Sequence, residues 1–334
     1  TREFLGLYKT YSEGKPSPLL PLEFQYADYA HWQREYLQGD ILTRQLDYWE
    51  DQLHELPGLH GLRLDFERPK VKLHQGAKVS GQLSARIATQ LLKIAKVHNL
   101  TPFMLLHALL ALLLARHSNC RDIVIGTPVA NRLQGELKPL IGFFVNTLVL
   151  RANTGHKSLT DYFAHIRQLH LDAQANQDVP FEQLVERLKV PRSAAHSPLF
   201  QIMMTIDTDF AISKGNDAKT FALPGLNIKA WQSELIQSKF DLNVGLNIND
   251  NGVTLNWLYD TSLFTEQRIS QLNDHMCRLL RGLCQVWEDR NLEFSSQSPH
   301  TLPMLSSEEV RYLQQDLNKK SSNYPKDKCI HELF

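Results

Sequence analysis

The sequence feature that most constrains the fold is its most apolar stretch, from Phe103 to Ala115, FMLLHALLALLLA. The run is 13 residues long and contains His107, so it is too short to cross a bilayer as a helix. Thr101 and Pro102 precede it and supply an N-cap and a first helical residue. We therefore predict a helix buried in the core of a globular domain.

Helix and strand patterns alternate around this run, which predicts a mixed α/β fold. Further helices are expected at residues 1–15, 26–37, 42–56 and 84–97, after Ser158 with its capping-box partner Asp161, and after a capping Thr265. The rings of Tyr26, Tyr29, Trp32 and Tyr36 are expected to pack in the core. Buried strands are expected in RDIVIGTPVANR, where Gly126 and Pro128 predict a turn, and in IGFFVNTLVLR and FQIMMTID. The alternating segments 242–248 and 253–259 flank Asn251-Gly252, which predicts a β-hairpin.

Composition excludes several classes of protein. The formal net charge is zero, which argues against broad electrostatic binding to nucleic acid or to an anionic membrane. The four cysteines form no CxxC pair, which favours free thiols in a reducing compartment. No export signal is visible, so we expect a cytoplasmic protein. His165 and His170 are spaced too far apart to present both rings on one helix face, so no metal site is expected.

The usual catalytic motifs (GxSxG, Walker A, GxGxxG and HExxH) are absent. Instead, polar residues recur where apolar elements begin or end: Arg132, Asn146-Thr147, Asp178 and Arg192. Asp178 and Pro180 are expected to begin a helix, with Glu182 in its first turn, and these placements complement the helix dipole. Each residue alone is explained by a cap, a turn or an ion pair, but their common order calls for another explanation.

Four stretches in this order resemble motifs of condensation domains from nonribosomal peptide synthetases. YADYAHW matches a Tyr-x-Asp-Tyr-Ala-x-Trp motif, and NQDVPFE matches Gln-Asp-x-Pro-Phe-Glu. IGFFVNT matches Ile-Gly-x-Phe-Val-Asn-Thr completely, with Arg151 downstream. RSAAHSPL keeps only Arg192, Pro198 and Leu199 of Arg-Asp-x-Ser-Arg-Asn-Pro-Leu. The tail, YPKDKCIHELF, resembles the start of an adenylation domain.

This resemblance implies a lobe like that of chloramphenicol acetyltransferase, within a two-lobed domain. Residues 1–72 would be the end of the first lobe and the connection between lobes, and residues 73–290 the second lobe. Residues 291–316 would be a linker, and 317–334 a truncated start of the adenylation domain. The family's catalytic His-His-x-x-x-Asp-Gly motif is absent from the sequence and is expected upstream of Thr1. We therefore expect a fragment that is inactive and unstable by itself.

The implied activity is peptide-bond formation between two acyl groups held as thioesters. The partners would be upstream and downstream carrier domains with their phosphopantetheine arms, and the adjoining adenylation domain. No cofactor is expected to bind this part directly. Asn146, Thr147, Asp178 and Ser197 would line or support the reaction channel, with Asn146 structural rather than catalytic. Arg132, or failing that Arg192, would pair with the Asp of the upstream motif.

Around Asn146, Gly142 is expected to allow a tight turn, while Phe143 and Phe144 pack the lobe. Several alternatives stay open. An epimerisation domain, or a dual epimerisation and condensation domain, would share the fold. A non-catalytic scaffold that docks carrier proteins belongs to another functional class, as does a free-standing acyltransferase that uses coenzyme A.

Overall fold

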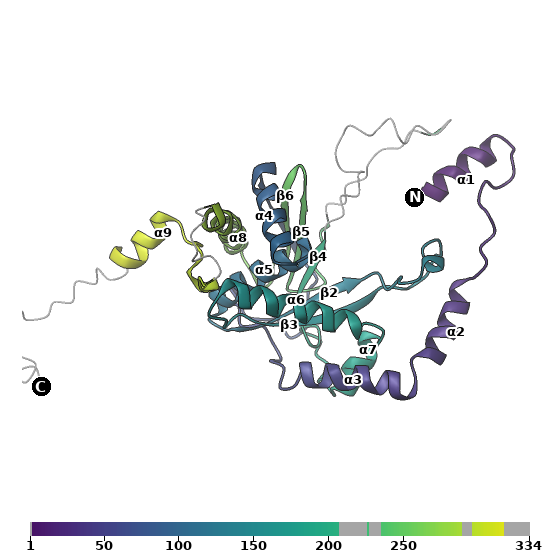
Figure 1. Cartoon of the computed structure of the whole chain (residues 1–334), viewed down its shortest axis with the longest axis horizontal. Helices are drawn as coiled ribbons and strands as arrows, with labels where there is room; N and C mark the ends of the chain where they lie inside the picture. Colours follow the sequence, from purple (N-terminus) through teal and green to yellow (C-terminus); the bar gives the residue numbers. More distant parts are fainter. Residues whose placement is uncertain (1, 207–225, 227–234, 289–295, 317–334) are drawn as a thin grey trace, which may run out of the picture.

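The computed structural model describes residues 2–206, 226, 235–288 and 296–316. A six-stranded mixed sheet forms the centre of the described part, with strand order β1-β6-β5-β4-β2-β3 (Figure 1). β4 runs parallel to β5 and β2, and the other neighbouring pairs are antiparallel. The strands are β1 Gly76–Leu83, β2 Asp122–Val129, β3 Asn146–Asn153, β4 Ile202–Ile206, β5 Leu242–Asn249 and β6 Gly252–Asp260. The predicted α/β class and the β5–β6 hairpin are confirmed.

Helices cover one face of this sheet. α8 packs on β1 and β6, α4 on β6 and β5, and α5 on β2, while α6 packs on β3. The α-helices are α1 Arg2–Ser12, α2 Tyr26–Tyr36, α3 Gly39–Gln52, α4 Ala85–Val97, α5 Pro102–Ser118, α6 Leu159–Ala175, α7 Phe181–Arg187, α8 Glu266–Glu288 and α9 Ser307–Arg311. Short 3-10 turns occur at Gly135–Leu137 and Pro299–Thr301, and a π-helical turn at Tyr312–Asp316. The predicted adenylation start, 317–334, lies outside the described residues.

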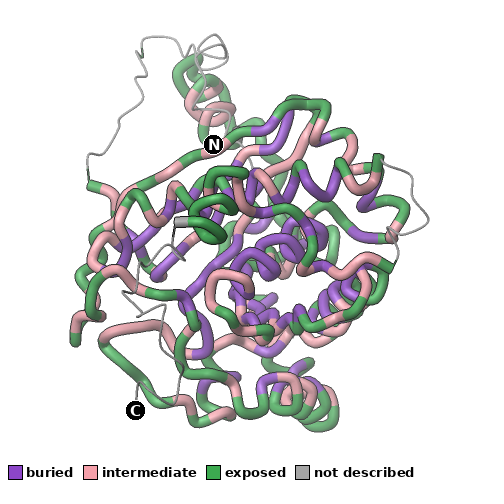
Figure 2. Tube along the Cα trace, turned by 90° about the vertical axis from the view of Figure 1, so that its left-hand side faces the viewer, coloured by how far each residue is buried: buried purple, intermediate pink, exposed green. Residues whose placement is uncertain are grey.

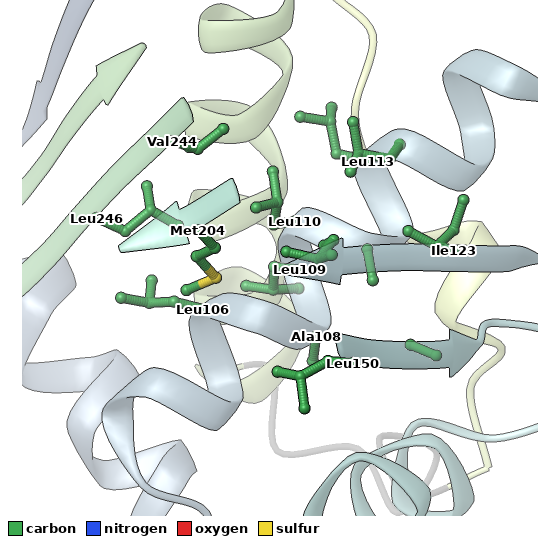
Figure 3. Packing of buried hydrophobic residues seen from close by; sticks show 14 of the residues in the cluster. Leu106, Ala108, Leu109, Leu110, Leu113, Ile123, Leu150, Met204, Val244 and Leu246 are labelled. Carbon is green, nitrogen blue, oxygen red and sulfur yellow. The ribbon is translucent and has the colours of Figure 1, made fainter. Parts of the chain in front are cut away.

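α5 is the core helix that the apolar run predicts. Every residue from Met104 to Ala115 is buried, and Figure 3 shows its leucines between the sheet strands and the neighbouring helices. Figure 2 shows the buried residues gathered in the middle of the trace and the exposed ones toward its periphery. Each buried leucine contributes roughly 1.5–3 kcal/mol, so this helix holds the lobe together. No single helix in the described ranges is long and apolar enough to span a bilayer, and α4 and α5 reach that length only as a pair bent by 100°.

Three of the predicted helix caps form as expected, and a fourth, at Ser84, does not. The Thr265 hydroxyl accepts from the Arg268 amide at 3.3 Å at the start of α8. The Thr101 hydroxyl accepts from the Met104 amide at 3.2 Å, and the Ser158 hydroxyl accepts from the Asp161 amide at 3.0 Å. Ser84 occupies the N-cap position of α4, but its side chain makes no capping hydrogen bond.

The turn predicted at Gly126 and Pro128 is wrong, because both residues lie inside β2. Gly126 pairs with Val149, and Pro128 pairs with Thr147. β2 meets β4 at Gly126, so Pro128 lies beyond that contact, where a missing N–H is tolerated. Gly126 is needed for packing, since a Cβ there would lie 2.2 Å from the Phe200 ring.

α2 packs outside the main core, in a small cluster of its own. Tyr29 is buried there with Leu137, Leu140 and Phe144. The prediction that the other rings of α2 pack in the core is wrong for its second half. Trp32 and Tyr36 are 42% and 38% exposed, and their rings stack on each other at 5.0 Å.

The C-terminal described segment returns to the lobe. Leu302 and Met304 are buried in the main core, and the Arg116 guanidinium donates to the Leu302 carbonyl at 2.6 Å. Glu309 at the start of α9 lies 2.8 Å from His275 Nε2 on α8. Within the predicted linker, 291–316, the described residues Leu302 and Glu309 therefore contact α5 and α8.

Candidate functional site

Asn146, the first residue of β3, uses its whole side-chain amide to hold a distant turn. Its Nδ2 donates to the carbonyls of Gln177 at 2.8 Å and Val179 at 2.7 Å. Its Oδ1 accepts from the amides of Thr147 at 2.8 Å and Phe181 at 3.1 Å. Because an amide offers two donor hydrogens and one acceptor oxygen with two lone pairs, the group is fully satisfied and buried. It fixes the turn that leads into α7.

The same turn is also fastened to α3. The Gln45 amide donates to the Asp178 carboxylate at 2.8 Å and accepts from the Asp178 backbone amide at 3.2 Å. Trp49 Nε1 donates to the Asn176 carbonyl at 2.8 Å. Pro180 is the N-cap residue of α7 and Glu182 lies in its first turn, as predicted, but Asp178 lies two residues before the cap and not in the helix. The contacts of Asn146, Gln45 and Trp49 with residues 176–181 are called the Asn146 junction below.

Arg151, downstream of Asn146 on β3, attaches the far end of α3. Its guanidinium binds the Asp122 carboxylate at 2.8 Å and donates to the His54 carbonyl at 2.6 Å. These contacts raise the pKa of Arg151, chiefly through the hydrogen bond to Asp122. α3 is therefore held against both ends of β3.

Arg132 fixes the arm between β2 and β3. Its guanidinium lies 4.1 Å from the Phe144 ring centroid and donates to the carbonyls of Leu137 and Leu140, the latter at 2.8 Å. Among the ion pairs between described residues, none includes Arg132 or Arg192. Arg192 is exposed in the loop after α7.

Residues 142–144 differ in two ways from their predicted roles. Phe144 is buried as expected, but the Phe143 side chain is 78% exposed. The Phe143 carbonyl accepts from Tyr26 Oη on α2 at 3.0 Å. Gly142 does not have a left-handed backbone. It is needed instead for close approach, since a Cβ would lie 2.2 Å from the Tyr26 ring.

Ser197 lies in a separate loop that leads into β4. Its carbonyl accepts from Gln201 Nε2 at 3.1 Å. The loop includes Leu199, which is buried with a φ of 63°, a left-handed conformation that strains a side-chain-bearing residue. Ser197 is therefore not part of the Asn146 junction.

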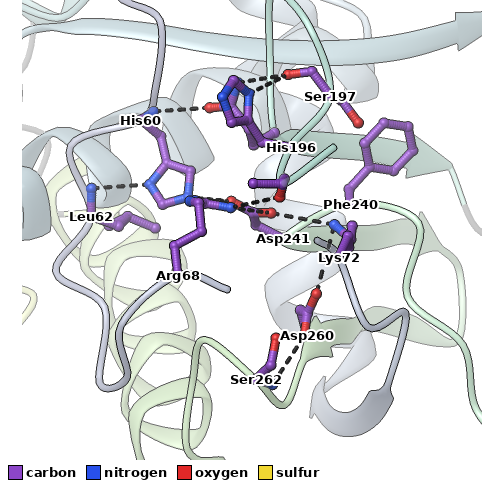
Figure 4. A network of polar contacts seen from close by, with 12 residues as sticks. His60, Leu62, Arg68, Lys72, His196, Ser197, Phe240, Asp241, Asp260 and Ser262 are labelled. Atoms are coloured by element: carbon purple, nitrogen blue, oxygen red, sulfur yellow. Dashed lines mark hydrogen bonds and ion pairs between the residues drawn. The ribbon is translucent and has the colours of Figure 1, made fainter. Parts of the chain in front are cut away.

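A buried charge cluster that the sequence did not suggest lies beside this loop (Figure 4). The Asp241 carboxylate, 0% exposed, accepts from His60 Nε2 at 3.1 Å, from both terminal nitrogens of Arg68, and from Lys72 Nζ at 3.3 Å. His60 Nδ1 accepts from the Leu62 amide at 3.2 Å. Burial by itself would raise the pKa of Asp241, but the hydrogen bonds from His60 and Arg68 hold it well below its ordinary value. This set of contacts is called the Asp241 hub.

An aromatic path connects the hub to the Asn146 junction. The rings of Phe181 and Phe200 lie 5.7 Å apart, and those of Phe200 and Phe240 lie 5.4 Å apart. Phe181 is held by Asn146, and Phe240 precedes Asp241 in the chain. The predicted polar residues thus fall into two groups, one at the Asn146 junction and one in the loop beside the Asp241 hub. The packed rings of Phe181, Phe200 and Phe240 form a wall that joins the two groups.

A cleft opens at the carboxyl ends of the parallel strands β2, β4 and β5, where ligands commonly bind in such sheets. Its volume is about 860 Å³, and its lining is mainly apolar. Val145 lines both this cleft and a pocket of about 230 Å³ beside Asn146 and Asp178. His170 at the cleft wall contacts His107 at 3.1 Å, and burial lowers the pKa of His170 to about 4.

The chemistry that these groups support is positioning. Within the described ranges no three His, Cys, Asp or Glu side chains are grouped as metal ligands would be. The hydrogen-bonding atoms of the Asn146 amide are already used within the protein. The signal for the missed hub was faint: Asp241 interrupts an apolar strand start, FDLNV, while its partners occur about 170 residues earlier in a charged loop.

Comparisons with known proteins agree with this architecture. The family model described as Condensation domain matches residues 1–299. Malpinin synthetase of Mortierella alpina is 35% identical over 100% of this chain, which spans 4% of that protein. Bacitracin synthase 3 of Bacillus licheniformis is 34% identical over 100% of the chain, which spans 5% of it. Gramicidin S synthase 2 of Aneurinibacillus migulanus is 32% identical, with 7% of its length spanned.

Solved structures share the fold. The X-domain from teicoplanin biosynthesis superposes with a TM-score of 0.76 at 23% identity, over 90% of this chain and 67% of that one. The first condensation domain of the CDA synthetase gives a TM-score of 0.62 at 15% identity, over 90% of this chain and 61% of that one. At these identities the likeness establishes the fold alone.

Proposed function

This chain belongs to the condensation-domain family, and on that premise we propose that it forms the second lobe of a domain that joins two carrier-bound acyl groups. The donor would be an acyl or peptidyl thioester on one carrier domain, and the acceptor an aminoacyl thioester on the next. The proposed partners are the upstream and downstream carrier domains with their phosphopantetheine arms, and an adjoining adenylation domain.

The proposed reaction forms a C–N bond and breaks a C–S bond. The acceptor's free amine attacks the donor carbonyl, the tetrahedral intermediate expels the donor's sulfur, and the amine proton ends on the released thiol. An α-amino group has a pKa of about 7.7–8.0, so a useful fraction is already nucleophilic near neutral pH. Fixing the two reactants in line therefore supplies most of the catalysis. An upstream histidine is proposed to assist the proton transfer.

The observation that carries this proposal is the convergence of three motif stretches at one wall. Asn146 of IGFFVNT binds the turn of NQDVPFE through Gln177 and Val179. Tyr29 of YADYAHW packs on Phe144 of IGFFVNT at 4.7 Å. If these three motif stretches were only local caps and turns, they would not be expected to contact one another. If they support one wall of a reaction channel, their contact is expected. Asn146, Thr147 and Asp178 are proposed to support that wall, with Ser197 at its other end.

A first lobe is proposed to cover the arm between β2 and β3. Leu133, Ile141 and Phe143 on this arm are 67%, 84% and 78% exposed, and so many exposed apolar side chains are typical of a surface that packs on another unit. Arg132 is the proposed partner for the Asp of the catalytic motif. Its guanidinium is already oriented by Phe144, and five donors leave some unused. The exposed Arg192 is the second candidate.

The test is a single-turnover assay on the full synthetase that contains this chain. Both carrier domains are loaded, the reaction is quenched, and the downstream carrier is analysed by mass spectrometry. An amide product on the downstream carrier supports the proposal. Carrier binding without product would favour the scaffold alternative, and a product formed only from acyl-coenzyme A would favour a free-standing acyltransferase.

Deuterium oxide as solvent separates the remaining alternatives in the same assay. Exchange at the Cα of a carrier-bound residue, with no amide formed, would identify an epimerisation domain. Exchange together with amide formation would identify a dual domain. The control is the same enzyme with the donor carrier left unloaded. Without a donor it should form no amide on the downstream carrier.

A further inference from the structure

We propose that Asp241 is a positioning residue for the condensation reaction, because its buried carboxylate locks the connection between α3 and β1 onto the loop that carries Ser197. The connection comprises residues 53–75, and the loop comprises residues 194–201. This inference rests on the proposed function, which supplies the reaction whose geometry the loop would set. The role is indirect, because the buried Asp241 carboxylate is bonded to His60, Arg68 and Lys72 within the described part of the chain.

The connection touches the loop at three points around the hub. The Lys72 amide donates to the Ala194 carbonyl at 2.9 Å, and Arg68 Nη1 reaches the Ala195 carbonyl at 3.5 Å. The His60 amide donates to Gln201 Oε1 at 3.0 Å. Three of the side chains bound to Asp241 therefore belong to residues that also contact the loop.

The loop's other end is attached to the backbone of Asp241 itself. The Asp241 amide donates to the Gln201 carbonyl at 3.0 Å. Gln201 Nε2 in turn donates to the carbonyls of Gly58 and Ser197, each at 3.1 Å. The carboxylate, the connection and the loop thus form one closed set of contacts.

The charges of the hub balance only when every partner is present. Asp241 and Asp260 are 0% and 1% exposed, and Arg68 and Lys72 supply two positive charges, with Lys72 3.7 Å from Asp260. His60 accepts at Nδ1 and donates at Nε2, which is the pattern of a neutral ring. Removing one charge would leave another buried and uncompensated, which is strongly unfavourable.

The loop needs such a lock because its conformation is strained. Leu199 has a φ of 63°, and the Phe200 amide closes a tight turn onto the Pro198 carbonyl at 2.7 Å. Strained residues of this kind persist only where the surroundings over-determine them. Releasing the hub should let this loop relax and move Ser197, together with the Phe200 ring that contacts the Asn146 junction through Phe181.

The test compares Asp241→Asn with Asp65→Asn in the full synthetase. Asp65 lies on the same connection and is also ion-paired, since its carboxylate binds Arg268 at 2.7 Å and the Thr265 hydroxyl at 2.9 Å. It fastens the connection to α8 and not to the loop, so it is a matched control. Single-turnover rates are measured at a temperature where both variants are folded by circular dichroism.

We expect Asp241→Asn to lower the single-turnover rate about 10- to 100-fold, the size of effect that a small misplacement of reacting groups produces. The downstream carrier concentration that gives half the maximal rate should be unchanged, because carrier docking is not affected. Asp65→Asn should change the rate less than about twofold. Equal rate losses in the two variants, or an unchanged rate in Asp241→Asn, would overturn the proposal.

If Asp241→Asn does not fold, His60→Ala replaces it, because that change removes one hydrogen bond and leaves every buried charge of the hub with its ion-pair partner. Amide hydrogen exchange over residues 193–201 is then measured in the full synthetase. Faster exchange there and a slower rate are expected, and unchanged exchange would refute the lock. A wild-type enzyme that forms no amide would refute the proposed function instead, while the exchange experiment would still test the lock.

Discussion

The Asn146 junction and the Asp241 hub both tie a loop to a distant helix or connection, but they do so with opposite chemistry. At the centre of the junction, the neutral side-chain amide of Asn146 binds four backbone groups. The hub uses a buried carboxylate against two cations and a histidine. Removing the neutral amide costs only its hydrogen bonds. Removing the buried carboxylate also leaves its cationic partners buried without a compensating charge. The difference teaches that the less conspicuous residue can be the costlier one to remove.

Asp241→Ala gives the largest expected loss of stability. It leaves Arg68 and Lys72 without their main partner in a buried site, so the free energy of unfolding should fall by about 3–5 kcal/mol. Urea titration followed by circular dichroism measures this loss. Asp250→Ala, at the exposed turn between β5 and β6, is the control and should change stability little. A loss below that of Asn146→Ala would reverse the ranking of the two regions.

Asn146→Ala should lower the free energy of unfolding by about 3 kcal/mol, the upper end for one lost polar group, because four backbone partners are stranded together. The amide of Phe181 should exchange faster with solvent, since it loses its acceptor. Asn146→Asp is the informative companion, because it keeps the acceptor oxygens and loses both donors. An Asn146→Ala protein with unchanged melting temperature and condensation rate would refute the structural role.

Gly126→Ala tests the aromatic path that joins the two regions. The new Cβ would fall 2.2 Å from the Phe200 ring, so overpacking should lower the free energy of unfolding by about 2 kcal/mol. Gly135→Ala is matched to it, because nothing lies within 4 Å of a Cβ there. If the two alanine variants unfold at the same urea concentration, the Phe200 ring is not held against Gly126.

The smallest expected effect is a difference in pH dependence. The depressed pKa of Asp241 means that its stabilising contribution is present above the ordinary carboxyl pKa of about 3.9 and is lost as the pH falls toward the folded value. The stability gap between wild type and Asp241→Asn should therefore narrow below about pH 4. The gap for Asn146→Ala should not depend on this group.

The quantity to measure is the difference in stability between wild type and variant at each pH, because buried histidines change the absolute stability of every variant. Burial lowers the pKa of His117 to about 4, so every variant should lose stability as the pH falls from about 6.5 toward 4. Subtracting wild type removes that common loss. A gap for Asp241→Asn that stays constant down to pH 3 would contradict the hub's charge balance.

Much of the fold was predictable because its signals are local. The apolar run of α5, the Thr101 and Ser158 caps and the Asn251-Gly252 hairpin each depend on residues within one element or on adjacent segments. Asn146 was also within reach, because an amide at the entrance of a strand is unusual and its partners follow about 30 residues later.

Tertiary contacts decided the rest. Gly126 and Pro128 look like a turn until Phe200 and β3 pack on them, and Trp32 and Tyr36 look like core until α2 takes its place outside the main sheet. The Asp241 hub joins residues about 170 positions apart, each of which would be an ordinary solvated charge in an isolated segment. Periodicity along the chain determined the helices, the hairpin and the buried helix at the centre. The tertiary structure decided which charges are buried and which side chains contact each other, because these contacts join loops that are far apart in the sequence.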